Sequence, residues 1–134
     1  MRNLLLVFAL CFAGCATHQF APPSGQWKTR SGQLLYKEGD RSIVGELNVS
    51  SIGKNAKLEF TKGGALSLIR VQRDATHARF EGPLARLGHT VTLPASPGSR
   101  DAGWLEILDK SATQQTFSLA SGGAQFSVQL APAH

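Results

Sequence analysis

The sequence predicts a mainly β protein, an antiparallel meander of about eight strands that forms an unclosed half-barrel with one short helix. From Trp27 onward, apolar and polar residues alternate with the period of two that is typical of strands with one buried and one solvated face. The composition, with 14 glycines in 134 residues and few long helix-forming stretches, favours strands joined by tight turns. A twisted sheet of that many strands must curl, which is why we expect a half-barrel.

The chain begins with a segment, residues 1–14, that has the pattern of a secretory signal peptide. Arg2 gives a basic start, residues 4–12 form an apolar run, and two small residues precede Cys15. The apolar run is less than half of the roughly 20 residues that cross a membrane as a helix. The residues that end in Cys15 resemble the bacterial lipobox, in which signal peptidase II cleaves before a lipid-modified cysteine. The resemblance implies that Cys15 is the lipid attachment site.

We expect lipidation of Cys15 rather than a disulfide, because the other cysteine, Cys11, lies inside the signal. One acyl chain holds a protein at a membrane only marginally, whereas two hold it stably, so a lipidated Cys15 would be a firm membrane anchor. Ala16 follows the cysteine, and in the sorting logic of bacterial lipoproteins a residue other than aspartate there implies the periplasmic face of the outer membrane. We expect residues 15–26 to form a lipidated tether, because Pro22 and Pro23 favour an extended chain.

Strands are expected at residues 27–36, 43–49, 57–61, 66–73, 77–82, 91–93, 116–119 and 125–130. The fourth of these is apolar on both faces in its middle, as expected of a central strand. A short helix is expected after Asp101, a plausible N-cap, because Trp104 and Leu108 lie at helical spacing. A strand through residues 104–108 is the competing interpretation.

The sequence indicates no enzyme, no cofactor and no metal site. The four histidines are His18, His77, His89 and His134, and they show no metal-ligand spacing. Glu46 and Glu59 lie on polar strand faces, where carboxylates are usually surface residues. The 14 Lys and Arg are scattered among nine Asp and Glu, so we expect a solvated surface near anionic lipid and no nucleic-acid partner. A monomer is expected.

The inward positions of the strands and of the helix are strongly apolar, and they allow two interpretations. Either the side chains fill a solid core, or the half-barrel keeps an apolar pocket for an acyl chain beneath the helix. The candidate pocket residues are Leu47, Leu58, Phe60, Leu68, Phe80, Trp104, Leu108, Phe117 and Phe126.

Three stretches resemble the outer-membrane lipoprotein receptor LolB, of the LolA/LolB superfamily: Trp27 with residues 31–34, the hairpin at 43–47, and residues 58–71. The order of later features is also similar to that of the family: Gly82 and Pro83 come first, then a proline-containing loop, then Trp104. The resemblance implies that residues 27–134 form a LolB-like unclosed barrel that accepts lipoproteins and places them in the outer membrane. The alternative function is a structural or inhibitory envelope lipoprotein that binds another protein through a solid sheet.

Overall fold

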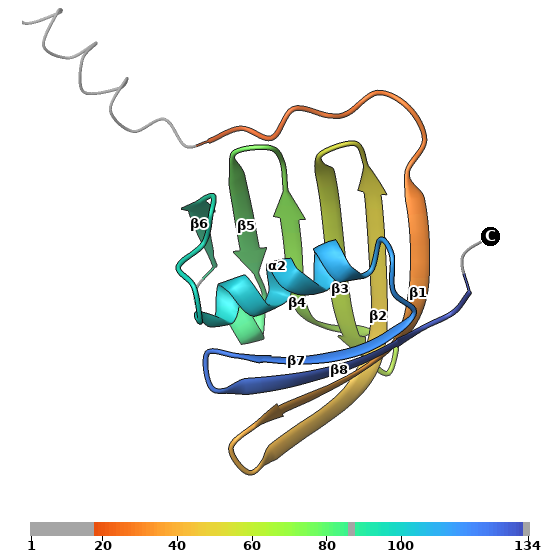
Figure 1. Cartoon of the computed structure of the whole chain (residues 1–134), viewed down its shortest axis with the longest axis vertical. Helices are drawn as coiled ribbons and strands as arrows, with labels where there is room; N and C mark the ends of the chain where they lie inside the picture. The colour runs from red at the N-terminus through yellow and green to blue at the C-terminus, as the bar shows by residue number, and fades with distance from the viewer. Residues whose placement is uncertain (1–17, 86–87, 133–134) are drawn as a thin grey trace, which may run out of the picture.

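The structure is a computed structural model, and it describes residues 18–85 and 88–132. Within these ranges, eight antiparallel strands form one sheet that does not close, and one α-helix packs against it (Figure 1). The architecture confirms the predicted fold class. The predicted signal peptide, residues 1–14, and Cys15 lie outside the described residues.

The strands are β1 (Lys28–Glu38), β2 (Arg41–Ile52), β3 (Asn55–Lys62), β4 (Leu66–Arg73), β5 (His77–Glu81), β6 (His89–Thr92), β7 (Thr116–Ser121) and β8 (Ala124–Leu130). A 3₁₀ turn, η1 (Pro83–Ala85), follows β5, and the helix α2 (Arg100–Lys110) lies between β6 and β7 in the chain. Every predicted strand is present. The first two are longer than predicted, because their ladder continues from Lys28 opposite Ser51 to Glu38 opposite Arg41.

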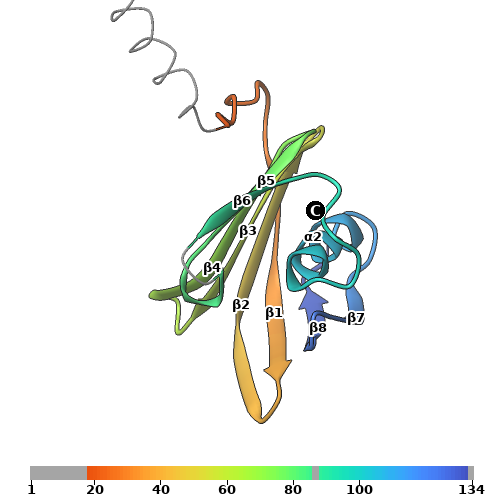
Figure 2. The same cartoon turned by 90° about the vertical axis from the view of Figure 1, so that its left-hand side faces the viewer.

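The first six strands follow one another in the sheet as they do in the sequence, but the last hairpin does not. The order is β6-β5-β4-β3-β2-β1-β8-β7, so β8 returns to pair with β1, with Leu34 opposite Val128. Figures 1 and 2 show that β7 and β8 cross below α2 while β3, β4 and β5 stand behind it. The sheet therefore curves around the helix, and β6 and β7 form its two free edges.

Alternation along the strands directs the apolar side chains to the concave face, where α2 lies. On β8, for example, Phe126, Val128 and Leu130 are buried while the residues between them are exposed. The helix contributes Trp104, whose ring lies 4.9 Å from that of Phe126 and 5.8 Å from that of Tyr36, between ring centroids. A single hydrophobic core thus joins the two arms of the curved sheet through the helix.

The helix starts at a different cap from the one predicted. Ser99 is the N-cap, and its side chain accepts a hydrogen bond of 3.1 Å from the backbone N–H of Ala102. Asp101 lies in the first helical turn, where a negative charge also favours the helix N-terminus. Serine and aspartate are both preferred N-caps, so residue type alone could not choose between them. The competing prediction of a strand at residues 104–108 is wrong.

Candidate functional site

The residues predicted to line an apolar pocket all lie in the hydrophobic core. They are Leu47, Leu58, Phe60, Leu68, Phe80, Trp104, Leu108, Phe117 and Phe126. None of them is more than 8% exposed. The ring of Trp104 fills the space between α2 and the sheet, with the ring of Phe60 at 6.1 Å between centroids. Of the two interpretations left open by the sequence, this burial favours the filled core.

Three of these core residues also border hollows at the surface, but each borders a different one. Leu58 borders a groove on the outer face of the sheet, and Phe117 borders a hollow over β1, β2, β7 and β8. Trp104 borders a hollow of about 270 Å³ beside the start of α2, together with Ile69 and Arg100. The predicted pocket residues therefore do not converge on a common one of these hollows.

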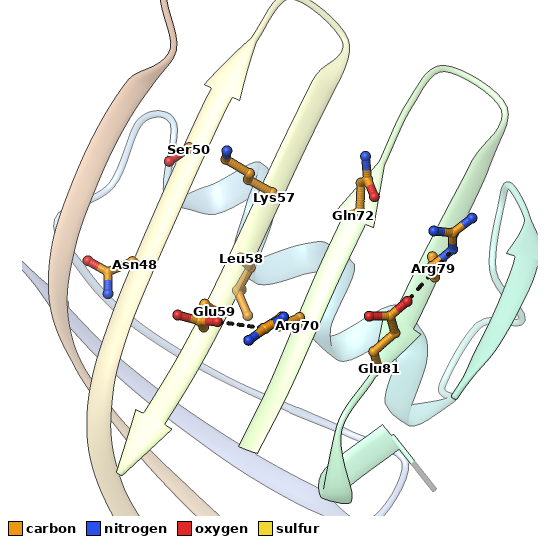
Figure 3. A pocket seen from close by; sticks show the side chains of 9 residues that line it. All are labelled: Asn48, Ser50, Lys57, Leu58, Glu59, Arg70, Gln72, Arg79 and Glu81. Carbon is orange, nitrogen blue, oxygen red and sulfur yellow. Dashed lines mark hydrogen bonds and ion pairs between the residues drawn. The ribbon is translucent and has the colours of Figure 1, made fainter. Parts of the chain in front are cut away.

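The outer face of the sheet carries a hollow of about 530 Å³ that spans β2, β3, β4 and β5, and we call it the outer groove. It is lined by Asn48, Ser50, Lys57, Leu58, Glu59, Arg70, Gln72, Arg79 and Glu81. Figure 3 shows the polar side chains of this set on the face of the four strands that points away from α2. They occupy every second position of each strand, which is why neighbouring strands present them on the same face.

The charges of the outer groove are mixed and partly paired. Glu59 Oε2 lies 2.7 Å from Arg70 Nε across β3 and β4, and Arg79 Nε lies 4.0 Å from Glu81 Oε1 on β5. The side chains of Arg70 and Glu59 are 64% and 40% exposed, so this ion pair contributes at most about 1 kcal/mol to stability. Its consequence is instead the charge pattern that the groove offers to a partner.

The outer groove offers hydrogen-bonding and charged side chains, several of which already have partners within the protein. Its lining contains no histidine or cysteine, and its hydroxyl group, on Ser50, hydrogen-bonds to Thr29 at 2.9 Å rather than to a base. Glu59 is engaged by Arg70, while Glu46 lies opposite Thr61 in the ladder. At one end, Lys57 Nζ lies 4.5 Å from the ring centroid of Trp27, which adds a cation–π contact. The groove can therefore form hydrogen bonds and ion pairs with a polar partner.

A second polar cluster, which sequence reasoning missed, lies at the turn between β4 and β5. His18 Nε2 of the predicted tether lies 2.6 Å from Asp74 Oδ2, and the His18 ring stacks on that of His77 with 3.7 Å between centroids. The backbone N–H groups of Thr76 and His77 donate to Asp74 Oδ1, at 2.9 and 2.8 Å. His18 and Asp74 are 56 residues apart in the sequence, so local spacing gave no signal of this cluster.

The carboxyl group of Asp74 is held in its ionised form. Partial burial on its own would raise the pKa of Asp74, but hydrogen bonds from the Thr76 backbone, the His18 ring and the His77 backbone outweigh it and hold that pKa well below its usual range. The cluster is half-buried, since the side chains of His18 and Asp74 are 24% and 18% exposed. It therefore presents a fixed anion beside a stacked pair of imidazoles.

Because two comparisons with known proteins find no match, the candidate function rests on the geometry described above. A scan against protein-family models finds no match, and a search of the curated proteins finds none either. Among the described residues, the structure contains no helix that is long and apolar enough to cross a membrane.

Proposed function

We propose that this protein is a lipid-anchored lipoprotein of the cell envelope that binds another envelope protein through the outer groove of its sheet. The observation that carries the proposal is the filled concave face: the helix and the aromatic core occupy the space in which an apolar ligand would sit. The outer groove, by contrast, gathers hydrogen-bonding and charged side chains on a broad open surface. The lipobox pattern at Cys15 supports the anchor, and the outer membrane is the proposed location.

The mixed charge of the groove indicates the kind of partner. Arg70 and Arg79 lie beside Glu59 and Glu81 on adjacent strands, so a complementary protein segment would carry acidic and basic side chains in alternation. A nucleic acid or an anionic lipid would meet the two groove carboxylates unfavourably. A folded partner protein can satisfy both signs, and its contacts with these exposed charges should weaken as salt is added.

Site-specific photocrosslinking in intact cells tests the partner. A photoreactive amino acid at Gln72, inside the groove, should give a discrete protein adduct, and charge reversal at Arg79 should remove that adduct. The same amino acid at Gln125, an exposed position of β8 outside the groove, is the matched control and should give none. No adduct at Gln72, or the same adduct at both positions, would contradict the proposal.

The anchor is tested separately by intact-mass measurement of protein extracted from membranes. The mature chain should begin at Cys15 and carry the added mass of its acyl groups, and Cys15→Ser should release the protein from the membrane. A mass equal to that of the unmodified chain, or a Cys15→Ser variant that still fractionates with the outer membrane, would rule out the lipid anchor.

The second candidate function is that of a LolB-like module that binds acyl chains or transfers lipoproteins. The unclosed sheet with a helix on its concave face is the arrangement that the resemblance to LolB implies. The hollow beside Trp104 and Ile69 is a small entry lined by both apolar and charged side chains. Native mass spectrometry of the chain expressed without its signal, which then carries no acyl anchor, distinguishes the two functions. Co-purified lipid or uptake of an apolar fluorophore would favour this candidate, whereas a lipid-free protein that takes up no fluorophore favours protein binding.

A further inference from the structure

The cluster at the turn between β4 and β5 brings together three side chains of metal-ligating type. His18, Asp74 and His77 each offer a ligand atom, and these atoms all lie within 4.8 Å of one another. They come from two distant parts of the chain: His18 precedes β1, whereas Asp74 and His77 flank the start of β5. The turn between Asp74 and His77 therefore provides two ligands, and the tether provides the third.

The donor set matches a divalent transition-metal ion. Two imidazoles and one carboxylate are a common ligand set for zinc and for other first-row metals, with a further position left for water. Zinc binds imidazole nitrogen at about 2.0–2.1 Å and carboxylate oxygen at about 2.0–2.2 Å, so its ligand atoms lie roughly 3 to 4 Å apart. The three side chains need only a small rearrangement to reach that spacing.

The surroundings hold two of the ligands in place. Asp74 Oδ1 accepts the two backbone hydrogen bonds of the turn, which leaves Oδ2, the atom that faces His18, for an ion. Thr76 Oγ1 lies 2.8 Å from His77 Nδ1 and orients that ring, as a hydrogen bond to the other ring nitrogen does for a metal-binding histidine. A carboxylate among the three ligands supplies the negative charge that favours a cation.

His18 is the ligand that must move. Its ring is nearly parallel to that of His77, at 14°, and the lone pairs of parallel rings do not converge on one point. An ion would replace the hydrogen bond between His18 Nε2 and Asp74 Oδ2, and the His18 ring would rotate off the stacked position so that both imidazoles can point at that ion. His18 lies outside the sheet, in contact with the ring of Phe20 at 4.8 Å and with Arg79 Nη2 at 3.5 Å through its carbonyl oxygen, so this rotation disturbs no strand.

We propose that His18, Asp74 and His77 form a binding site for a divalent transition-metal ion, with zinc as the best-matched ion, which fastens the tether to the turn between β4 and β5. Bound metal would hold the segment that follows Cys15 against this end of the sheet. If Cys15 carries lipid, as proposed above, the same end of the sheet would face the membrane. The metal site itself does not depend on the lipid anchor or on the outer groove.

Cobalt titration of the full chain, purified in detergent without a histidine tag, tests the site. Co²⁺ is the probe, because its visible absorption reports nitrogen and oxygen coordination, and Zn²⁺ should displace it. The wild-type protein should bind one ion per chain, and His18→Ala or His77→Ala should weaken binding by tenfold or more. His18→Ala is the decisive variant, since His18 lies outside every strand and its loss leaves the sheet intact.

His89→Ala is the matched control. His89 Nε2 also lies close to a carboxylate, at 2.8 Å from Asp101 Oδ2, but this pair is not part of the three-residue cluster. His89→Ala should bind Co²⁺ as the wild type does. No visible band in the wild type, or equal cobalt affinity in the wild type and in His18→Ala, would overturn the proposal.

A second readout reports the fastening of the tether. Chymotrypsin can cut after Phe20, and Zn²⁺ should slow this cut several-fold in the wild type and in His89→Ala, because the bound metal holds the tether on the sheet. In His18→Ala, Zn²⁺ should leave the rate unchanged, which also controls for any effect of zinc on the protease. Equal zinc protection of the wild type and of His18→Ala would overturn the fastening.

Discussion

Arg30 Nη1, on β1, donates a hydrogen bond of 2.6 Å to the backbone carbonyl of Ser111, the C-cap of α2. The same guanidinium donates to the carbonyls of Gln114 at 3.1 Å and Ala131 at 3.2 Å. A positive charge at the C-terminal end of a helix complements the helix dipole and satisfies carbonyls that have no partner within the helix. One side chain of the sheet thus holds the end of the helix, the loop after it and the end of β8.

The first prediction is that Arg30→Met lowers the free energy of unfolding by about 2 kcal/mol, the range of hydrogen bonds to a charged group. Arg30→Lys should be intermediate, since an ammonium group cannot span the three carbonyls as a planar guanidinium does. Urea unfolding measures both values. Lys37→Met, an exposed position on the same strand, is the control and should change stability by less than about 0.5 kcal/mol. Equal losses for Arg30→Met and Lys37→Met would contradict the role of Arg30.

The second prediction concerns Trp104, which is 1% exposed and lies among three aromatic rings of the sheet. Trp104→Ala should cost about 3–5 kcal/mol, because the curved sheet cannot collapse onto the cavity left behind. Among the described residues, none accepts a hydrogen bond from Trp104 Nε1, so Trp104→Phe removes no polar contact and should cost much less. Thermal unfolding compares the two variants. Similar losses would show that the ring volume at this position does not hold the core together.

Much of the fold follows from local patterns. Alternation placed the strands, glycine-containing turns separated them, and the spacing of Trp104 and Leu108 indicated the helix. The pairing of β8 with β1 could not be predicted from local patterns. Strand partners far apart in the chain are determined by packing of the whole core rather than by a turn. That pairing is what brings Phe126 close to Trp104.

The candidate sites were harder to predict than the fold. Glu59 pairs with Arg70 because the ladder of β3 and β4 shifts its register between Phe60 and Thr61, and a sequence pattern does not reveal such a bulge. The apolar inward positions were correct, but whether they enclose a pocket depends on side-chain volumes across the core. The cluster of His18 with Asp74 could not be predicted, because it depends on the path that the tether takes over the sheet.

The third prediction concerns Gly103, a buried position at which α2 packs tightly against the sheet. A Cβ atom at this position would lie 2.9 Å from Phe126 Cε2 and 3.0 Å from Ser121 Cβ, which is closer than carbon atoms pack. Gly103→Val should therefore push the helix away and destabilise the protein by about 2–3 kcal/mol, despite the low intrinsic helix propensity of glycine. Ala102→Val, at the neighbouring half-buried position, is the control and should cost about 1 kcal/mol or less. Chemical denaturation that ranks the two variants in the opposite order would contradict this close contact.

The last prediction concerns the ionisation of Tyr36, the single tyrosine of the chain. Its side chain is fully buried, and its hydroxyl donates a hydrogen bond of 2.8 Å to Glu38 Oε2. Burial, with a further contribution from the bond to Glu38, raises the pKa of Tyr36 to about 12, although Arg100 and Arg41 oppose the rise. Because there is one tyrosine, the near-ultraviolet absorbance of the phenolate reports this group alone. We expect the folded protein to titrate well above the usual value of about 10.

This shift sets the direction in which alkaline pH changes stability. A tyrosine whose pKa is higher in the folded than in the unfolded state favours folding fully below pH of about 10, and that contribution is lost as pH rises toward about 12. The loss should approach about 2–3 kcal/mol, at about 1.4 kcal/mol for each pH unit. Tyr36→Phe removes the ionisable group, so the difference between wild type and variant isolates this phase from the titration of lysines. On the acid side, the hydrogen bond from Tyr36, with help from Arg100, lowers the pKa of Glu38 in the folded protein. Ionised Glu38 therefore stabilises the fold at pH values above the pKa that it has in the unfolded chain, and Tyr36→Phe should weaken this contribution. A phenolate that titrates near pH 10 while circular dichroism still reports folded protein would contradict the buried position of Tyr36.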